Sequence, residues 1–458
     1  MGAAFVALLF ISGQLGGPAG AVSESRPGEG PLLLSGLRLQ VSVTSELRAG
    51  EAPLLPDANP RSFVAEILTP RLGLELRRPD FTFQLFYGPS IFWEDPNPIS
   101  TGARQILPAD TVTRVRGQVP ISVSGSGPLI LHSADLVLDA RPSRDVSLTA
   151  SANGSIGSPD YTALPLVLGT VQGTLPPIVS LMSGTAQASV RAKASRRWEL
   201  ALTAQLFHWQ WLDVPETLPA SIITGQTLVS AEPSATLRLS ARDSLGLGTT
   251  VAEAWYSDGA GLGTITPALT WRRHVTPRAD LRLTLGLTYA HALGPTPPGA
   301  VPLLGSSRSA TGPIGSFELI SRLVRRDQIM ILGGAGGAVD FYVDPVLGTA
   351  GPRGAAGAGL TAISAPRWMI SLRGDFATAL RTTPYPTLVG GIAPDETAFY
   401  LSLFVRRWVS KNLMPEIGAR WADRGPALVT PDFGFHQREI WIYLALTATT
   451  QPIARLVH

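Results

Sequence analysis

Apolar and polar residues alternate with a period of two along most of this chain. In one segment, Leu283, Leu285 and Leu287 fall on one side of an extended backbone, while threonine and glycine fall on the other. A helix would scatter these leucines around its circumference, so the alternation indicates β-strands with one apolar and one polar face. The same alternation recurs at 37–44, 187–194, 399–406 and 440–446.

The alternating segments are joined in a regular way. Short charged turns, such as RRPD at 77–80 and SRR at 195–197, join strands into pairs, and longer connections rich in Gly, Pro, Ser and Asp separate the pairs. We predict an all-β fold: a single antiparallel transmembrane β-barrel of about 18 strands, with 16 as the alternative, short turns at one end and long loops at the other. The expected long connections are 94–126, 157–183, 213–231, 293–312, 344–353, 380–395 and 424–435.

Size and composition favour a membrane barrel over a soluble sandwich. A ring of eighteen strands is too wide for side chains to fill, so its apolar face must point outward and its polar face inward. Charged residues are only 16% of the chain, and no stretch of 18 uncharged apolar residues predicts a helical span. Cysteine is absent, which excludes a disulfide framework and thiolate metal sites.

Aromatic residues gather at the predicted strand ends, as the interfacial belts of membrane proteins require. Trp198 and Trp368 flank short turns, and Trp93, Trp209 and Trp255 lie toward the long loops. The alternative is that these are core aromatics of a soluble β protein. That alternative is weakened because no second apolar face is available to complete a buried layer.

On these patterns, residues 37–448 resemble the porin-like β-barrel proteins of the outer membrane of Gram-negative bacteria. The resemblance implies periplasmic short turns, extracellular long loops, surrounding membrane lipid and insertion by the barrel assembly machinery. No short motif identifies a particular family. The chain also departs from the usual aromatic C-terminus, because it runs on through QPIARLVH, so any terminal assembly signal must lie within 437–448.

The N-terminal segment has the form of a secretory signal. An apolar stretch from Ala3 to Ile11 is followed by small residues ending at Ala21, although no Lys or Arg precedes the apolar core. We therefore expect a signal peptide at 1–21, a periplasmic segment at 22–36, the barrel at 37–448 and a periplasmic tail at 449–458. A disordered or buried N-terminus is the alternative.

Charged residues on the polar face are the main candidates for function. Fixed charges in a narrow aqueous passage set ion preference, and the excess here is basic, so a mild preference for anions follows if the lumen is open. The alternative is that these residues pair across strands and stiffen the wall. The residues expected to line the lumen are Arg38, Glu75, Arg191, Lys193, Arg238, Arg282, Glu318, Arg322, Arg373, Asp375, Arg406 and Arg420, with Arg77, Asp135, Asp139 and Glu416 on the same face.

Three functions remain in competition. The first is a porin-like channel for passive passage of small solutes, the second a structural barrel with a closed lumen that displays its loops, and the third a barrel enzyme. No catalytic, cofactor or metal motif is present, and the net charge of +3 is too dispersed to indicate nucleic acid. An enzyme would need a rim pair such as His208 with Asp213 or His132 with Asp135. The connections 94–126 and 157–183 are candidates for a constriction.

Overall fold

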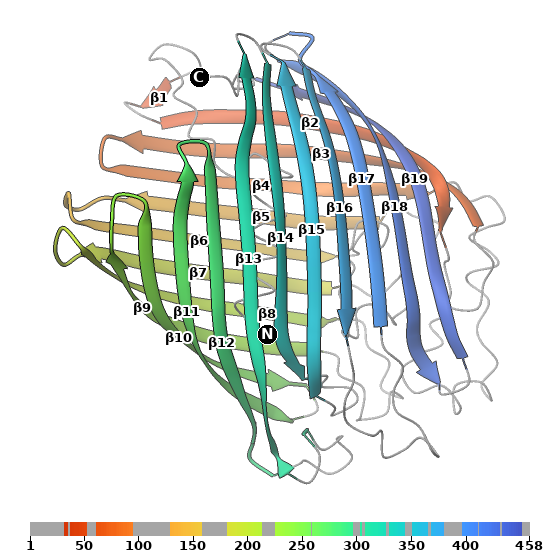
Figure 1. The fold of residues 1–458 in the computed structure, drawn as a ribbon. Helices are drawn as coiled ribbons and strands as arrows, with labels where there is room; N and C mark the ends of the chain where they lie inside the picture. The colour runs from red at the N-terminus through yellow and green to blue at the C-terminus, as the bar shows by residue number, and fades with distance from the viewer. Residues whose placement is uncertain are drawn as a thin grey trace.

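Eighteen antiparallel strands of the described chain close into one barrel in the computed structural model (Figure 1). Each strand from β2 to β18 pairs with its successor, and the ring closes where the last strand pairs with β2. The short strand β1 pairs with β2 and was not predicted. The strands are β1 (Leu32–Leu34), β2 (Leu37–Ala52), β3 (Arg61–Arg78), β4 (Phe81–Glu94), β5 (Leu129–Ala140), β6 (Val146–Gly157), β7 (Leu181–Lys193), β8 (Trp198–Trp211), β9 (Gly225–Arg238), β10 (Asp243–Tyr256), β11 (Gly261–Thr276), β12 (Ala279–Leu293), β13 (Ser309–Arg326), β14 (Ile329–Val343), β15 (Ala350–Ser364), β16 (Trp368–Ala379), β17 (Glu396–Arg407), β18 (Leu413–Thr430) and β19 (Phe433–Thr449).

The structure describes 32–34, 37–52, 61–94, 129–157, 181–212, 225–257, 259–295, 303–304, 307–326, 329–343, 350–364, 368–379, 396–410, 412–430 and 433–450. The expected signal peptide at 1–21 lies outside these residues, as do nearly all of the connections 94–126 and 157–183. Across the described residues, no helix has the length and hydropathy needed to cross a bilayer.

One end of the barrel has compact turns with a recurring serine cap. Ser143, Ser195 and Ser240 each accept hydrogen bonds at Oγ from the backbone N–H groups two and three residues later, at 2.9–3.3 Å. A serine at the first position of a turn can satisfy donors that the strand ladder leaves unpaired. These turns therefore hold neighbouring strands together without a long connection.

At the opposite end, the strands are longer than predicted. β13 begins at Ser309, inside the connection expected at 293–312, and β9 begins at Gly225, inside the one expected at 213–231. The connection expected at 424–435 is wrong, because β18 runs to Thr430 and β19 begins at Phe433. A backbone ladder needs only N–H and C=O groups, so it continues where the apolar alternation stops.

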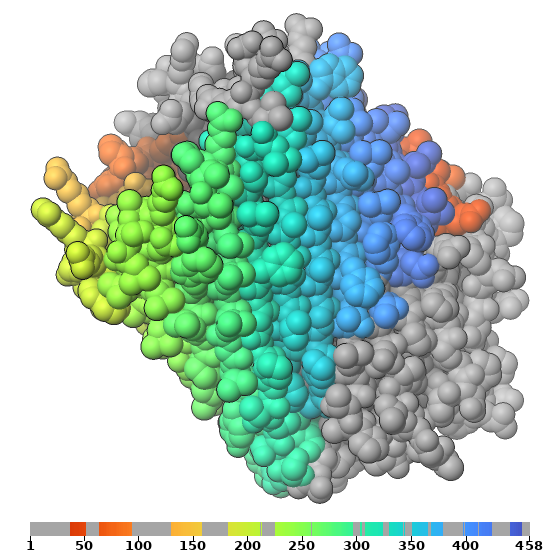
Figure 2. All heavy atoms as spheres, in the orientation of Figure 1, coloured from red at the N-terminus to blue at the C-terminus, as the bar shows by residue number. Residues whose placement is uncertain are grey.

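The two faces of the barrel wall differ in the solvent exposure of their side chains. Leu285 is 69% exposed and Ile442 is 59% exposed, whereas Arg48 on the other face is 8% exposed. Side chains diverge on the convex side of a closed sheet and converge on its concave side, so the leucine rows point outward. The near wall presents a continuous outer layer of side chains from β9 to β19 (Figure 2). That apolar band suits hydrocarbon, and a closed ring leaves no strand edge unpaired there.

Candidate functional site on the inner wall

The charged residues predicted to line the lumen alternate with outward-facing apolar residues. Arg282, for example, lies between Leu281 and Leu283 on β12, and Arg406 on β17 is the register partner of Glu416 on β18. By the same alternation all twelve lie on the inward face, on strands β2, β3, β7, β9, β12, β13, β16, β17 and β18. By their contacts, ten of the twelve divide into two groups.

In the first group, cations and acids are brought together as ion pairs. Arg373 forms a bidentate pair with Asp375, with N–O distances of 2.6 and 2.9 Å. Arg406 Nε lies 2.5 Å from Glu416 Oε2. Glu75 pairs with Arg77 at 3.0 Å. Only the Arg406–Glu416 pair joins two strands, because the other two pairs lie within β16 and within β3. All three are charge-assisted hydrogen bonds, and stiffening of the wall by pairing across strands stays a prediction.

In the second group, the charges stay apart within the described chain. Arg191, Lys193, Arg238 and Arg322 form no ion pair there, and they lie near the short-turn ends of β7, β9 and β13. Arg282 and Glu318 are cross-strand neighbours in register but also form no ion pair. We call Arg191, Lys193, Arg238, Arg282 and Arg322 the basic arc.

A dense group of inward side chains marks the place where the first and last strands meet (Figure 1). Its residues lie in rows of register partners across β2, β19, β18 and β17. One row consists of Gly50, Trp441, Arg420 and Ser402, in that order across the sheet. The next rows run Arg48, Tyr443, Gly418, Phe404 and Glu46, Ala445, Glu416, Arg406, and Tyr400 completes what we call the seam cluster.

Arginine side chains lie over aromatic rings in the seam cluster. The Cζ of Arg420 lies 5.0 Å from the ring centre of Tyr400 and 4.8 Å from that of Trp441. Arg48 lies over Trp441 at 4.7 Å, and the Trp441 and Tyr443 rings are 5.7 Å apart at a tilt of 56°. Cation–π contacts of this kind contribute more when the groups are desolvated, and Trp441 is only 3% exposed.

Two glycines make room for these rings. A Cβ at Gly50 would lie 2.4 Å from Trp441 Cβ and 2.2 Å from the Ile440 carbonyl oxygen. A Cβ at Gly418 would lie 2.3 Å from the Tyr443 ring. The Tyr443 ring therefore lies against Gly418, whereas Gly50 lies against the backbone and Cβ of the neighbouring strand. A larger residue at position 418 must displace the ring, and one at position 50 must displace the backbone.

Both acids of the seam cluster accept hydrogen bonds from neighbouring side chains. Tyr443 donates its hydroxyl to Glu416 Oε1 at 2.7 Å, and the other oxygen of Glu416 accepts from Arg406. Arg48 donates to Glu46. Neither Glu46 nor Glu416 bonds to Arg420, which has no hydrogen bond or ion pair among the described residues.

Neutral hydroxyl pairs cover much of the remaining inner wall. Cross-strand neighbours Thr266 and Thr288 lie 2.9 Å apart at their hydroxyl oxygens, and Thr361 and Ser371 lie 3.0 Å apart. A hydroxyl can donate and accept, so these pairs leave acceptors available to water. The inward face is thus polar even where it carries no charge.

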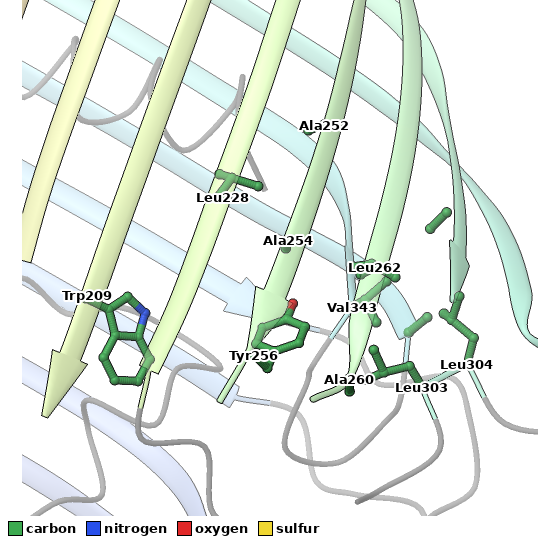
Figure 3. Packing of buried hydrophobic residues seen from close by; sticks show 12 residues of the cluster. Trp209, Leu228, Ala252, Ala254, Tyr256, Ala260, Leu262, Leu303, Leu304 and Val343 are labelled. Atoms are coloured by element: carbon green, nitrogen blue, oxygen red, sulfur yellow. The ribbon is translucent and has the colours of Figure 1, made fainter. Parts of the chain in front are cut away.

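An apolar cluster occupies the inward face at the loop end of β10 and β11. Leu303 and Leu304, from the β12–β13 connection, pack near Ala260 and Leu262 (Figure 3). Leu304 has a φ of 62°, a conformation that leucine seldom adopts, so its burial must offset strain. Trp209 is buried in the same cluster, so its expected place in an outer aromatic belt is wrong, whereas Trp198, Trp255 and Trp368 are exposed.

Of the two residue pairs considered for catalysis, only His132 and Asp135 both lie in the described chain, and they bond to different partners. His132 Nδ1 bonds to the Tyr87 hydroxyl at 2.8 Å, while Asp135 pairs with Arg71 at 3.0 Å. His208 contacts Thr227 at 2.9 Å, and Asp213 lies outside the described residues. Within the described ranges, no group of three His, Cys, Asp or Glu residues is placed to hold a metal ion.

Sequence reasoning missed the aromatic half of the seam cluster. Trp441 alternates with Ile440 and Ile442, so the period of two alone could have placed it inward. Its contacts with Arg48 and Arg420 could not be found in that way, because they depend on the register between the two ends of the chain.

No protein-family model and no curated protein matches the sequence. Among solved structures, the chain is similar to a bacterial polysaccharide outer membrane secretin, with 12% identity, 90% of this chain and 97% of that chain covered, and a TM-score of 0.35. It is similar to the outer membrane protein OpdK of Pseudomonas aeruginosa, with 10% identity, coverage of 90% and 98%, and a TM-score of 0.41. It is also similar to OccAB3 of Acinetobacter baumannii, with 8% identity, coverage of 91% and 100%, and a TM-score of 0.44.

The geometry itself defines the class of protein. A closed antiparallel ring with an apolar convex face and a polar concave face can satisfy its backbone and its side chains only across a lipid bilayer. Short turns at one end and longer connections at the other are the form of transmembrane β-barrels. The chain has the fold of a transmembrane β-barrel.

Proposed function

We propose that this barrel is a channel for passive passage of small solutes across the outer membrane, with a mild preference for anions. Eighteen strands enclose more space than the inward side chains of small barrels fill. The charged and hydroxyl side chains that face this space suit water rather than a dry core. In this proposal outer-membrane lipid surrounds the barrel, the assembly machinery inserts it, and the twelve charged residues named from the sequence line the pore.

The observation that carries the proposal is the basic arc. Its five cations face the lumen near the short-turn end and form no ion pair in the described chain. The inward acids on the same strands and on the neighbouring β8 are Glu199, Glu232, Asp280 and Glu318, so the five cations are in excess. Fixed charges of one sign raise the local concentration of mobile ions of the other sign.

Reversal potentials in planar bilayers test this proposal. We expect the purified, refolded barrel to give discrete conductance steps. Under a KCl gradient, its reversal potential should have the sign expected when chloride is more permeant than potassium. Replacing Arg238, Arg282 and Arg322 with Gln should lower the chloride-to-potassium permeability ratio by about twofold or more, because it removes unpaired charge.

The matched control removes charges that already neutralise one another. In the double variant Arg373→Gln with Asp375→Asn, one ion pair is lost and the net charge of the lumen is unchanged. We expect its permeability ratio to stay within measurement error of the wild-type value. A cation-selective wild type, or equal shifts in both variants, would contradict the anion preference.

A barrel with a closed lumen is the second candidate, and one observation favours it. Leu303 and Leu304, from the β12–β13 connection, pack onto the inward face at the loop end of β10 and β11. If the barrel folds, inserts and shows no conductance steps, this structural role replaces the channel.

A further inference from the structure

We propose that Arg420 is a binding site for the carboxylate group of a small solute anion within the lumen, with Ser402 as its neighbouring donor. The inference rests on the proposed channel function and names one chemical class of solute that the channel would recognise. It assigns different roles to two kinds of inward cation. The basic arc attracts anions in general, and Arg420 binds the carboxylate group of a solute.

The first step is the way in which Arg420 is held. Its guanidinium lies against the rings of Tyr400 and Trp441 at 5.0 and 4.8 Å. Contact with a ring face uses the flat side of the guanidinium and leaves its in-plane N–H donors available. The rings therefore orient the group and restrict its motion without consuming its hydrogen-bonding capacity.

The second step is that the nearby acids are engaged elsewhere. Glu416 accepts from Arg406 and Tyr443 through its two oxygens, and Glu46 accepts from Arg48. Among the described residues, Arg420 is the one arginine of the seam cluster without a carboxylate partner. Within these residues the cluster carries one more cation than it has acids, and the excess is at Arg420.

The third step is that a polar residue, Ser402, lies beside Arg420. Ser402 on β17 is the register partner of Arg420 on β18, and both lie on the inward face. No described residue bonds to the Ser402 side chain, so its hydroxyl can donate to the same ligand. Together the two residues offer a planar fork of N–H donors with an O–H donor beside it.

This donor set selects for geometry as well as for charge. A carboxylate presents two oxygens that match the two parallel N–H donors of a guanidinium, whereas chloride is spherical and gains only from charge. Lysine retains the charge but not the planar fork, so Arg420→Lys separates the two contributions. The site should therefore prefer a small carboxylate such as acetate over chloride.

The test is block of the chloride current by acetate in planar bilayers. We expect block of the wild-type channel to saturate with acetate concentration. Arg420→Lys should weaken the apparent affinity by about tenfold or more, since one charge-assisted bond is lost, and Ser402→Ala should weaken it by about threefold. Arg282→Lys on the basic arc is the matched control, and its acetate affinity should change by less than about twofold.

A second readout separates this inference from the channel proposal. In detergent, the methyl resonance of acetate should broaden with the refolded wild-type barrel and should recover its width with Arg420→Lys. If no current passes but this difference is found, the channel proposal fails and the binding site stands. If chloride current passes but block does not saturate, or Arg420→Lys and Arg282→Lys behave alike, the binding site is overturned and the channel stands.

Discussion

The inner wall is built differently where the chain ends meet and on the opposite side. In the seam cluster, Trp441 and Tyr443 pack closely against Gly50 and Gly418, and ion pairs engage Glu46 and Glu416. On the basic arc from β7 to β13, cations such as Arg191 and Arg238 form no ion pair among the described residues. The difference suggests that closure of the barrel and attraction of solutes are handled by separate parts of the wall.

The largest effect on the free energy of unfolding is expected from substitution of Gly50, because neighbouring atoms occupy the space that a Cβ would need. In Gly50→Ala the new Cβ would overlap the Ile440 carbonyl oxygen and Trp441 Cβ, and because these atoms belong to the backbone or are fixed to it, the strands must shift. We expect a loss of about 2–3 kcal/mol in the free energy of unfolding, measured by denaturant titration in lipid vesicles.

Gly154→Ala on β6 is the control for that substitution. The nearest atom to its added Cβ would be the Ser183 carbonyl oxygen at 3.7 Å, which is ordinary contact. Its stability should match the wild type within about 0.5 kcal/mol. Equal losses of unfolding free energy in the two variants would contradict the close packing around Gly50.

Glu416→Gln is expected to have an intermediate effect on the free energy of unfolding. Its pair with Arg406 is only 17% and 14% exposed, so Glu416→Gln leaves a shielded guanidinium without its partner and weakens the bond from Tyr443. We expect a cost of about 2 kcal/mol in the same vesicle titration. Glu232→Gln on β9, where no ion pair is found in the described chain, should cost less than about 0.5 kcal/mol, and a larger cost there than at Glu416 would reverse the comparison.

The smallest effect is expected from an ion pair in the open part of the lumen. Arg71 and Asp135 are 46% and 45% exposed, so water screens their attraction. Asp135→Asn should change the free energy of unfolding by no more than about 0.5 kcal/mol. A loss as large as that of Glu416→Gln would show that exposure does not control the contribution of these pairs.

The sequence predicted the parts of this fold that depend on local alternation. The outward row of Leu283, Leu285 and Leu287 and the inward place of Arg282 follow from the period of two, and the structure has the eighteen strands that were counted. Strand ends were less predictable. β9 and β13 begin at Gly225 and Ser309, inside segments expected to be connections, because a backbone ladder can continue where the apolar alternation stops.

The seam cluster could not be predicted, for a reason of register. Trp441 lies beside Gly50 only because β19 and β2 pair with one particular offset, and residues near opposite ends of a chain carry no local signal of that offset. For the same reason, sequence could not show that Glu416 would pair with Arg406 while Arg420 would stay without an acid.

The most direct test of the account is which face of a strand meets water. The chain has no cysteine, so single cysteines can be placed at Thr284 and Leu285 on β12, whose side chains point inward and outward. In lipid vesicles, a charged thiol reagent that cannot enter a bilayer should modify Thr284→Cys readily and Leu285→Cys only after denaturation. Equal modification of the two, or faster modification at position 285, would contradict a water-filled barrel with its apolar face in lipid.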